Sequence, residues 1–412
     1  MKNRFIILLL GMLPFIMVLG NSMFIPILPE FSKALQISAT QTSLLLSFFN
    51  IPAALVIPIA GFLSDRFGRK TIILWSLAFM IAGGSICFAS GYLANRYAYE
   101  GLLFGRILQG IGAGGTSPLA MSLAGDLFQG EMRAKTLAVL EVFNGTTKIV
   151  APVLGAFMAL AAWFAPFSLF PILGAALFLF ILTFVKTAPS GKDALSFCQY
   201  AKRVFHVFDQ QKAYLFPLYL LGGTGMFLLF GMLYDLAYFI EDLYQIDGFF
   251  KGFVYSFPLG ALAISSSWTG KRLKSLKSNL HYLMAGMVLM FGSFIGLLIF
   301  QSFPFFLFFL TIAVGGLGFM LPPINTLITS SVNDMERGIV VSLYGMARFL
   351  GVALGPVVFG LLIYNRQFLF SFCFLLLLIS QSIFLFVFRG EWEKFNKYGK
   401  AFNEFTKLKK KF

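Results

Sequence analysis

Long apolar runs are the feature that most limits what this chain can fold into. A helix needs about 20 apolar residues to cross a hydrocarbon core of about 30 Å, and runs of that length recur along almost the whole sequence. The chain is therefore expected to be an all-α polytopic membrane protein with twelve transmembrane helices. The predicted spans are 5–28, 41–63, 72–94, 98–125, 136–160, 163–185, 214–239, 249–270, 280–300, 303–330, 338–362 and 366–388.

Composition agrees with a membrane environment. Of the 412 residues, 58% are hydrophobic and only 12% are charged, whereas soluble domains carry about 25% charged residues. Too little polar surface remains to cover a soluble globule, which excludes a soluble enzyme domain, a disordered tail and a secreted disulfide scaffold. The three cysteines are widely spaced and predict neither a metal site nor a disulfide framework. Two basic residues precede the first run, as in a signal peptide, but the run is long enough to predict an uncleaved span.

The distribution of Lys and Arg predicts the orientation of the chain. Of 32 such residues, 25 fall in the two termini and the loops on their side, and three fall inside spans. The opposite side carries only Lys33, Arg96, Lys251 and Arg366. By the positive-inside rule both termini are cytoplasmic, in a multi-pass protein of the cell membrane. The net charge of +15 then points to the bilayer as partner and not to nucleic acid.

The spans divide into two parallel halves. The predicted domains are a six-helix bundle over 1–185, a cytoplasmic linker over 186–213, a second bundle over 214–388 and a basic cytoplasmic tail over 389–412, which is expected to lie on the inner leaflet. Five pairs of identical residues recur between the halves at one offset of 204: Gly112 and Gly316, Gly114 and Gly318, Pro118 and Pro322, Arg133 and Arg337, Pro152 and Pro356. Repeats related in this way are a transporter architecture with the substrate site between the halves.

The loop after the second span carries a distinctive pattern of glycines and charges. It reads Gly61-Phe-Leu63-Ser-Asp65-Arg66-Phe-Gly68-Arg69-Lys70. This pattern resembles the G-x-L-x-D-R-x-G-R-K signature of the major facilitator superfamily. The resemblance implies two pseudo-symmetric six-helix bundles joined by a latch, in which Asp65 reaches helix 11 and Arg69 reaches Asp126. An ordinary solvated loop is the alternative.

Two further stretches resemble the drug:proton antiporter branch of that family. The fourth span contains Arg106-Ile-Leu-Gln109-Gly110-Ile-Gly112-Ala-Gly114, similar to R-x-x-Q-G-x-G, and the first span ends with a similar Gly/Pro pattern. The fifth span departs from the family pattern, because alanines replace two glycines around its proline. The residues expected to mediate close helix packing are Gly110, Gly112, Gly114, Pro152, Gly355 and Pro356.

Charged residues inside the spans predict the coupling site. A charge at the bilayer midplane costs roughly 2.5–3.5 kcal/mol, so such residues face a cavity or a partner. Glu141 is the first candidate for the proton-coupling acid and Asp235 the second, with Arg106 as an accompanying cation. The alternatives are a structural ion pair for Glu141, a solvated rim acid for Asp235 and a snorkelling side chain for Arg106.

Polar side chains on the same spans predict a substrate cavity. Its expected members are Asn21, Gln109, Asn144, Lys148, Asn325, Tyr344 and Arg348. The intramembrane charges are three basic and two acidic, which favours a neutral, zwitterionic or anionic amphiphile, such as a drug-like compound or a siderophore. The proton gradient is the expected energy source, without a cofactor, and a monomer is expected to suffice.

Three other function classes remain as alternatives. A solute importer of the same superfamily would share the motifs, because residues do not fix the direction of transport. A membrane enzyme would need clustered acids or a His/Ser nucleophile set, and the spans carry only scattered single charges. A channel fits the repeat and the latch loop less well than alternating access. The sequence therefore predicts a secondary transporter that exports its substrate, not an enzyme.

Overall fold

The computed structural model describes residues 2–93, 96–185, 197–244, 249–273, 275–300, 302–332 and 334–408. Regular secondary structure in these residues is helical, as required in a bilayer, where backbone polar groups must bond within their own segment. The first half contains α1 (Lys2–Ser22), η1 (Ile25–Ile27), α2 (Leu28–Leu35), α3 (Ala39–Phe67), α4 (Arg69–Leu93), α5 (Ala98–Gly114), α6 (Ser117–Leu127), α7 (Gly130–Ala159), η2 (Ala165–Ser168) and α8 (Leu169–Phe184). The second half contains α9 (Phe197–Tyr244), α10 (Phe249–Val254), α11 (Ser256–Gly270), α12 (Leu276–Ile299), α13 (Phe303–Ser330), α14 (Asp334–Leu362) and α15 (Arg366–Leu408).

Two of the predicted spans are each divided into two α-helices. In the described part of the chain, ten helical segments are individually long and apolar enough to cross a membrane. The spans predicted over 98–125 and 249–270 are each built from two shorter helices, α5 with α6 and α10 with α11. The breaks precede Pro118 and Pro258, and a proline removes one backbone donor from a helix.

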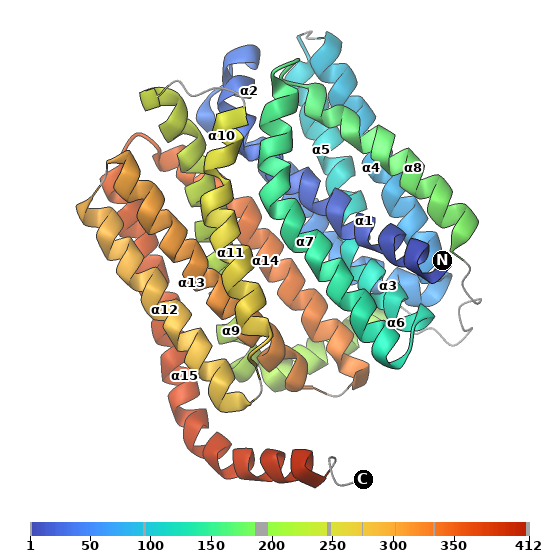
Figure 1. The fold of residues 1–412 in the computed structure, drawn as a ribbon, viewed down its shortest axis with the longest axis vertical. Helices are drawn as coiled ribbons and strands as arrows, with labels where there is room; N and C mark the ends of the chain where they lie inside the picture. The colour runs from blue at the N-terminus through green and yellow to red at the C-terminus, as the bar shows by residue number, and fades with distance from the viewer. Residues whose placement is uncertain are drawn as a thin grey trace.

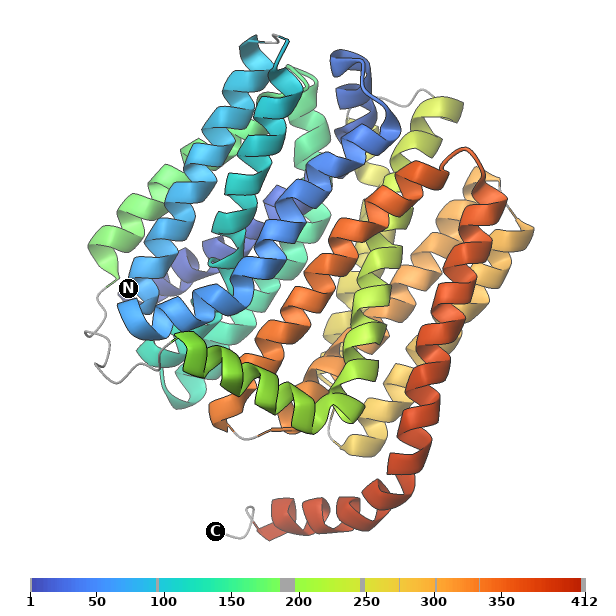
Figure 2. The ribbon, with the colours of Figure 1, turned by 180° about the vertical axis from the view of Figure 1, so that it is seen from behind.

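Two helices end or begin at residues that differ from the predicted ranges. The first predicted span, 5–28, ends as an α-helix at Ser22 and continues through the short η1 into α2. The linker predicted as a loop over 186–213 is helical from Phe197, because α9 begins there; residues 186–196 lie outside the described part. Figure 2 shows the first turns of α9 lying across one end of the molecule before the helix turns into its span. From residue 390 onward, the side chains of the basic tail predicted over 389–412 lie outside the described part of the chain.

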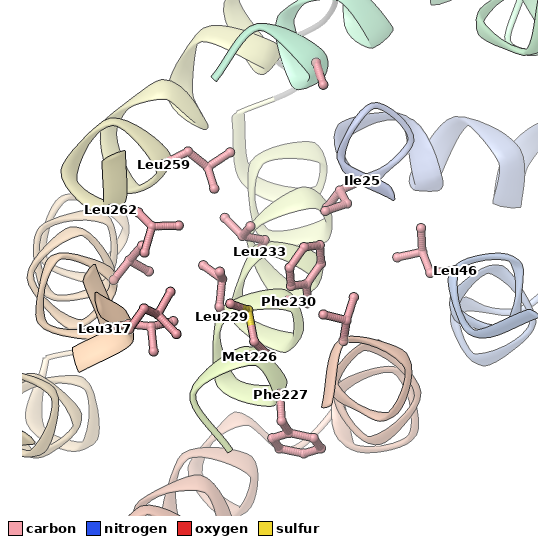
Figure 3. Packing of buried hydrophobic residues seen from close by; sticks show 14 of the residues in the cluster. Ile25, Leu46, Met226, Phe227, Leu229, Phe230, Leu233, Leu259, Leu262 and Leu317 are labelled. Carbon is pink, nitrogen blue, oxygen red and sulfur yellow. The ribbon is translucent and has the colours of Figure 1, made fainter. Parts of the chain in front are cut away.

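The helices form two bundles that lie side by side (Figure 1). Helix α3 packs against α14, and α7 packs against α10 and α11, so these helices make the seam between the halves. Within the second half, α9 is central: its buried Met226, Leu229 and Leu233 face Leu262 of α11 and Leu317 of α13 (Figure 3). This is the pseudo-symmetric two-bundle fold expected from the sequence.

Glycines let helix backbones touch within each bundle. A Cβ atom added at Gly110 of α5 would lie 2.2 Å from the Phe49 carbonyl oxygen of α3, and one at Gly355 of α14 would lie 2.3 Å from the Phe227 carbonyl oxygen of α9. Only glycine permits such approaches. Gly112 and Gly114 make similar contacts with α4 and α3, and Pro152 and Pro356 lie within the unbroken α7 and α14.

Candidate functional site

We call the helix ends on the side predicted to be extracellular the outer ends. The two halves are in polar contact there. The Ser47 hydroxyl of α3 donates to the Ala353 carbonyl of α14 at 2.6 Å. The hydroxyls of Thr42 on α3 and Tyr238 on α9 are hydrogen bonded at 2.6 Å. Because Thr42 and Ser47 are buried, these contacts close the outer side of the seam.

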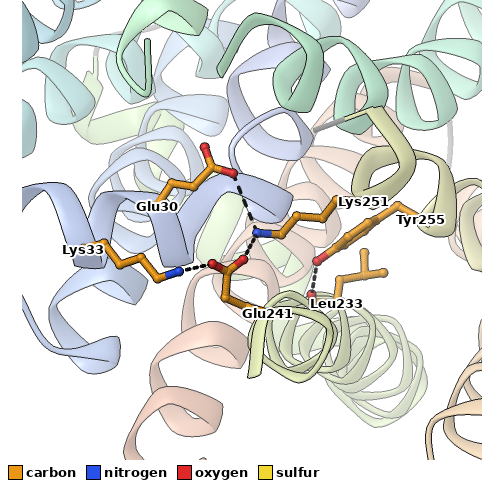
Figure 4. A network of polar contacts seen from close by, with 6 residues as sticks. All are labelled: Glu30, Lys33, Leu233, Glu241, Lys251 and Tyr255. Atoms are coloured by element: carbon orange, nitrogen blue, oxygen red, sulfur yellow. Dashed lines mark hydrogen bonds and ion pairs between the residues drawn. The ribbon is translucent and has the colours of Figure 1, made fainter. Parts of the chain in front are cut away.

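Four charged side chains bridge the halves above this seam (Figure 4). Lys251 of α10 lies 2.6 Å from Glu241 Oε2 and 3.7 Å from Glu30 Oε1, and Lys33 of α2 pairs with the other oxygen of Glu241. The Lys251 side chain is fully buried. Sequence reasoning missed this set because it used Lys33 and Lys251 only to orient the chain; the nearby acids at 30 and 241 were the available signal.

A cavity of about 620 Å³ opens beside these charges on the outer face. Its walls come from α2, the outer end of α9 and the turn before α15, and they include Lys33, Tyr238, Glu241, Tyr364 and Arg366. It shares none of its lining residues with the predicted substrate cavity. We therefore treat it as an outer vestibule and not as the substrate site.

Charged residues on α7 and α14 lie within electrostatic range of one another. We call Glu141, Asn144 and Lys148 of α7 with Tyr344 and Arg348 of α14 the α7–α14 cluster. The charges of Glu141, Lys148 and Arg348 are close enough to interact, although the residues belong to different halves. Glu141 is exposed, and Asn144, Lys148 and Arg348 are half-buried. The Arg348 guanidinium lies 5.6 Å from the centre of the Tyr344 ring.

Three polar atoms of the α7–α14 cluster are buried without a hydrogen-bond partner in the described part of the chain. They are Asn144 Oδ1, the Tyr344 hydroxyl and Arg348 Nε. Buried polar atoms in proteins are nearly always paired, because an unpaired one costs about 1–3 kcal/mol. The cluster therefore offers both hydrogen-bond donors and hydrogen-bond acceptors to a bound molecule, beside two cations.

Arg106 lies elsewhere, in the core of the first half. It is almost fully buried, and it donates to the Leu45 carbonyl at 2.9 Å, the Gly20 carbonyl at 2.8 Å and Gln109 Oε1 at 2.9 Å. It ties α1, α3 and α5 together and does not snorkel to the surface. Gln109 and Asn21 are also buried in this half, and neither belongs to the α7–α14 cluster.

Asp235 is likewise separate from the α7–α14 cluster. It is fully buried on α9, and its Oδ1 lies 3.3 Å from Arg366 Nη2 at the start of α15. Burial and the ion pair exclude the solvated rim acid considered above. Asn325 is exposed on α13.

The signature loop contains one contact implied by the family resemblance. Arg69 Nε lies 2.9 Å from Asp126 Oδ2, and Asp65 is close enough to interact with both charges. Lys70 donates to the Leu182 carbonyl at 2.8 Å. Gly68 ends α3 at φ +88°, a conformation that favours glycine.

Other parts of the loop have simpler surroundings. A Cβ atom at Gly61 would have only the Tyr200 hydroxyl within reach, at 4.0 Å, and the Arg66 guanidinium lies 5.5 Å from the centre of the Phe67 ring. The contact of Asp65 with helix 11 stays a prediction.

Among the described residues there is no group of His, Cys, Asp and Glu side chains that could hold a metal ion.

Comparison with known proteins identifies the family. A family model described as Major Facilitator Superfamily matches residues 10–356. The chain belongs to the Major Facilitator Superfamily. It is 38% identical over 402 residues to the bacillibactin exporter of Bacillus subtilis (strain 168), covering 96% of this chain and 98% of that relative. It is 26% identical over 185 residues to the quinolone resistance protein NorA of Staphylococcus aureus, covering 44% of this chain and 46% of NorA. The protein is thus a multi-pass membrane transporter.

Solved structures of this superfamily have the same fold. The human organic anion transporter MFSD10 (TETRAN) superposes with a TM-score of 0.71 at 18% identity, covering 92% of this chain and 99% of that one. A bacterial homolog of the human lysosomal transporter Spinster gives a TM-score of 0.72 at 16% identity, covering 94% and 97%. At these identities the similarity concerns the fold alone.

Proposed function

We propose that this transporter exports an amphiphilic anion of the siderophore class from the cell by alternating access, with the α7–α14 cluster as its substrate site. The observation that carries the proposal is that the like charges of Lys148 and Arg348, one from each half, lie within electrostatic range of each other, beside buried polar atoms that lack partners in the described part of the chain. A ligand held by both cations contacts both halves, which is what alternating access between two repeats requires.

The charge of the α7–α14 cluster favours an anion. Two cations and one acid leave a net positive site when Glu141 is ionised, and cations paired with a ligand anion make strong charge-assisted hydrogen bonds. Export of an anion is also assisted by a membrane potential that is negative inside, by about 2.3 kcal/mol per charge per 100 mV. The near full-length similarity to a bacillibactin exporter supports the same substrate class.

Proton coupling is assigned to Glu141 in this proposal. It is the acid of the α7–α14 cluster, it is exposed, and its charge interacts with that of Lys148. Protonation of Glu141 changes the charge of the cluster by one unit, which is the change that coupling to a proton gradient needs. Asp235 is less suited, because it is fully buried and paired with Arg366 outside this cluster.

The remaining parts of the proposal follow from the arrangement of the chain. Both halves of the substrate site come from one polypeptide, so we propose a monomer in the cell membrane. The charge distribution supports cytoplasmic termini. No cofactor has a role in this scheme, in which the proton gradient supplies the energy.

Transport by purified protein in liposomes tests the substrate class. Bacillibactin and the lipophilic cation tetraphenylphosphonium are offered under an imposed pH gradient to the wild-type protein and to Lys148→Ala and Arg348→Ala. We expect bacillibactin transport that both substitutions reduce, while the control Lys135→Ala, at an exposed i,i+4 pair, behaves as the wild type. Preferential transport of the cation, or unchanged bacillibactin transport in both variants, would contradict the proposal and favour a multidrug transporter for cations.

A further inference from the structure

The charges at the outer ends are arranged so that each half carries one acid and one base. The first half supplies Glu30 and Lys33 from α2, and the second supplies Glu241 from α9 and Lys251 from α10. Two of the contacts cross the seam, from Lys33 to Glu241 and from Lys251 to Glu30. A third, from Lys251 to Glu241, stays within the second half. Figure 4 shows the four side chains converging.

This distribution matters when the halves separate. An ion pair that spans a seam normally leaves two uncompensated charges behind, and removing the partner of a buried charge is strongly unfavourable. Here Lys251 keeps Glu241 as its partner, and Glu30 and Lys33 lie three residues apart on one helix, where opposite charges are neighbours. Neither half acquires a net charge at this site on opening.

The neighbouring hydrogen bonds across the seam also leave no uncompensated charge when they break. Thr40 donates to the Gly360 carbonyl at 3.3 Å, and Tyr234 donates to the Ala39 carbonyl. These groups are neutral, so water can replace the lost hydrogen bonds when the seam opens. The charged set therefore supplies the long-range attraction that closes the outer side.

We propose that Glu30, Lys33, Glu241 and Lys251 form the outer gate of the transport cycle, in which complementary signs across the seam close the gate and neutrality within each half lets it reopen. The fully buried Lys251 is the centre of the gate, because it contacts an acid from each half. This inference is separate from the proposed substrate class, because the operation of the gate does not depend on which molecule is carried.

Reversal of the charges tests this pattern without changing the number of charged groups. The double variant Glu241→Lys with Lys251→Glu keeps an opposite-charge pair within the second half but turns both contacts across the seam into repulsions. The double variant Glu30→Lys with Lys33→Glu does the same from the first half. The quadruple variant restores attraction across the seam.

The opening of the gate is measured by thiol labelling at one buried position. Ser43 of α3 is buried, and its hydroxyl lies in the region of Gly360 of α14. With Ser43→Cys in a Cys198→Ser background, a membrane-impermeant maleimide is added to intact cells, and labelling is normalised to that of the denatured protein. Cys87 and Cys373 are buried and serve as internal controls.

Each double variant is expected to label at least about tenfold faster than the parent, because like charges placed together cost several kcal/mol. The quadruple variant is expected to return to the parent rate. Parent-like labelling in both doubles, or a quadruple variant as fast as the doubles, would overturn the proposal. If a double variant fails to reach the membrane, the parent is labelled at low and high salt instead: Lys33 is 69% exposed, so salt should accelerate labelling, and a salt-independent rate would overturn the proposal.

Discussion

Gly252 offers a direct way to hold the outer side of the transporter open. This residue lies on α10 in the second half and packs against α7 of the first half. A Cβ atom added there would lie 2.7 Å from the Cα of Val153 and 2.8 Å from the Pro152 carbonyl oxygen. Both neighbours are backbone atoms, so neither can rotate away. Gly252→Ala therefore forces the two halves apart at this point.

The size of the effect follows from the geometry. Carbon atoms pack best at about 3.5–4.0 Å, so the new methyl group requires a local separation of about 1 Å. Overpacking of this kind costs about 1–3 kcal/mol. The cost falls on the outer-closed state alone, because the contact crosses the seam and is absent once the halves part. The ratio of outer-open to outer-closed protein should rise about 5- to 150-fold.

Labelling of Ser43→Cys from outside the cell measures this ratio. The matched control is Gly260→Ala on α11 of the same half, where an added Cβ atom has nothing within 4 Å. We expect faster labelling for Gly252→Ala and an unchanged rate for the control. Equal rates for the two variants, with both folded in the membrane, would refute the assignment of this contact to the closed outer seam.

Three further changes test other parts of the structure. Arg106→Leu removes the hydrogen bonds that tie α5 to the Leu45 and Gly20 carbonyls, each worth about 1.5–3 kcal/mol for a charged donor, and should lower the thermal unfolding temperature in detergent; an unchanged temperature would contradict a structural tie. Gly68→Ala should cost about 1–3 kcal/mol because of its positive φ, whereas Gly145→Ala, in open space within a helix, should not destabilise. Glu141→Gln removes the titrating group and should abolish acceleration of substrate transport by a pH gradient; retained acceleration would exclude Glu141 as the coupling acid.

The apolar runs predicted most of the fold because a bilayer constrains every span in the same way. They did not predict which spans would break. The helix is interrupted before Pro118 and before Pro258, yet α13 continues through Pro322 and Pro323. A proline removes one donor, and whether the helix then ends depends on neighbours that the local sequence does not specify.

The site was only partly predictable for a related reason. Helical spacing places Glu141, Asn144 and Lys148 on one stripe of α7, because periodicity determines which residues share a face. Periodicity could not show what such a face meets. Arg106, on α5, turns out to bind the helices α3 and α1 of its own bundle. The outer gate was missed because Lys33 and Glu241 are 208 residues apart and meet only in the folded chain.

Equilibrium binding of labelled bacillibactin to the purified transporter tests the central claim most directly. If Lys148 and Arg348 hold the substrate from opposite halves, each substitution to Ala should weaken binding by roughly 10- to 150-fold, corresponding to about 1.5–3 kcal/mol for a hydrogen bond to a charged group. The control Lys135→Ala should bind as the wild type does. Wild-type affinity in both Lys148→Ala and Arg348→Ala would place the substrate elsewhere and contradict the claim.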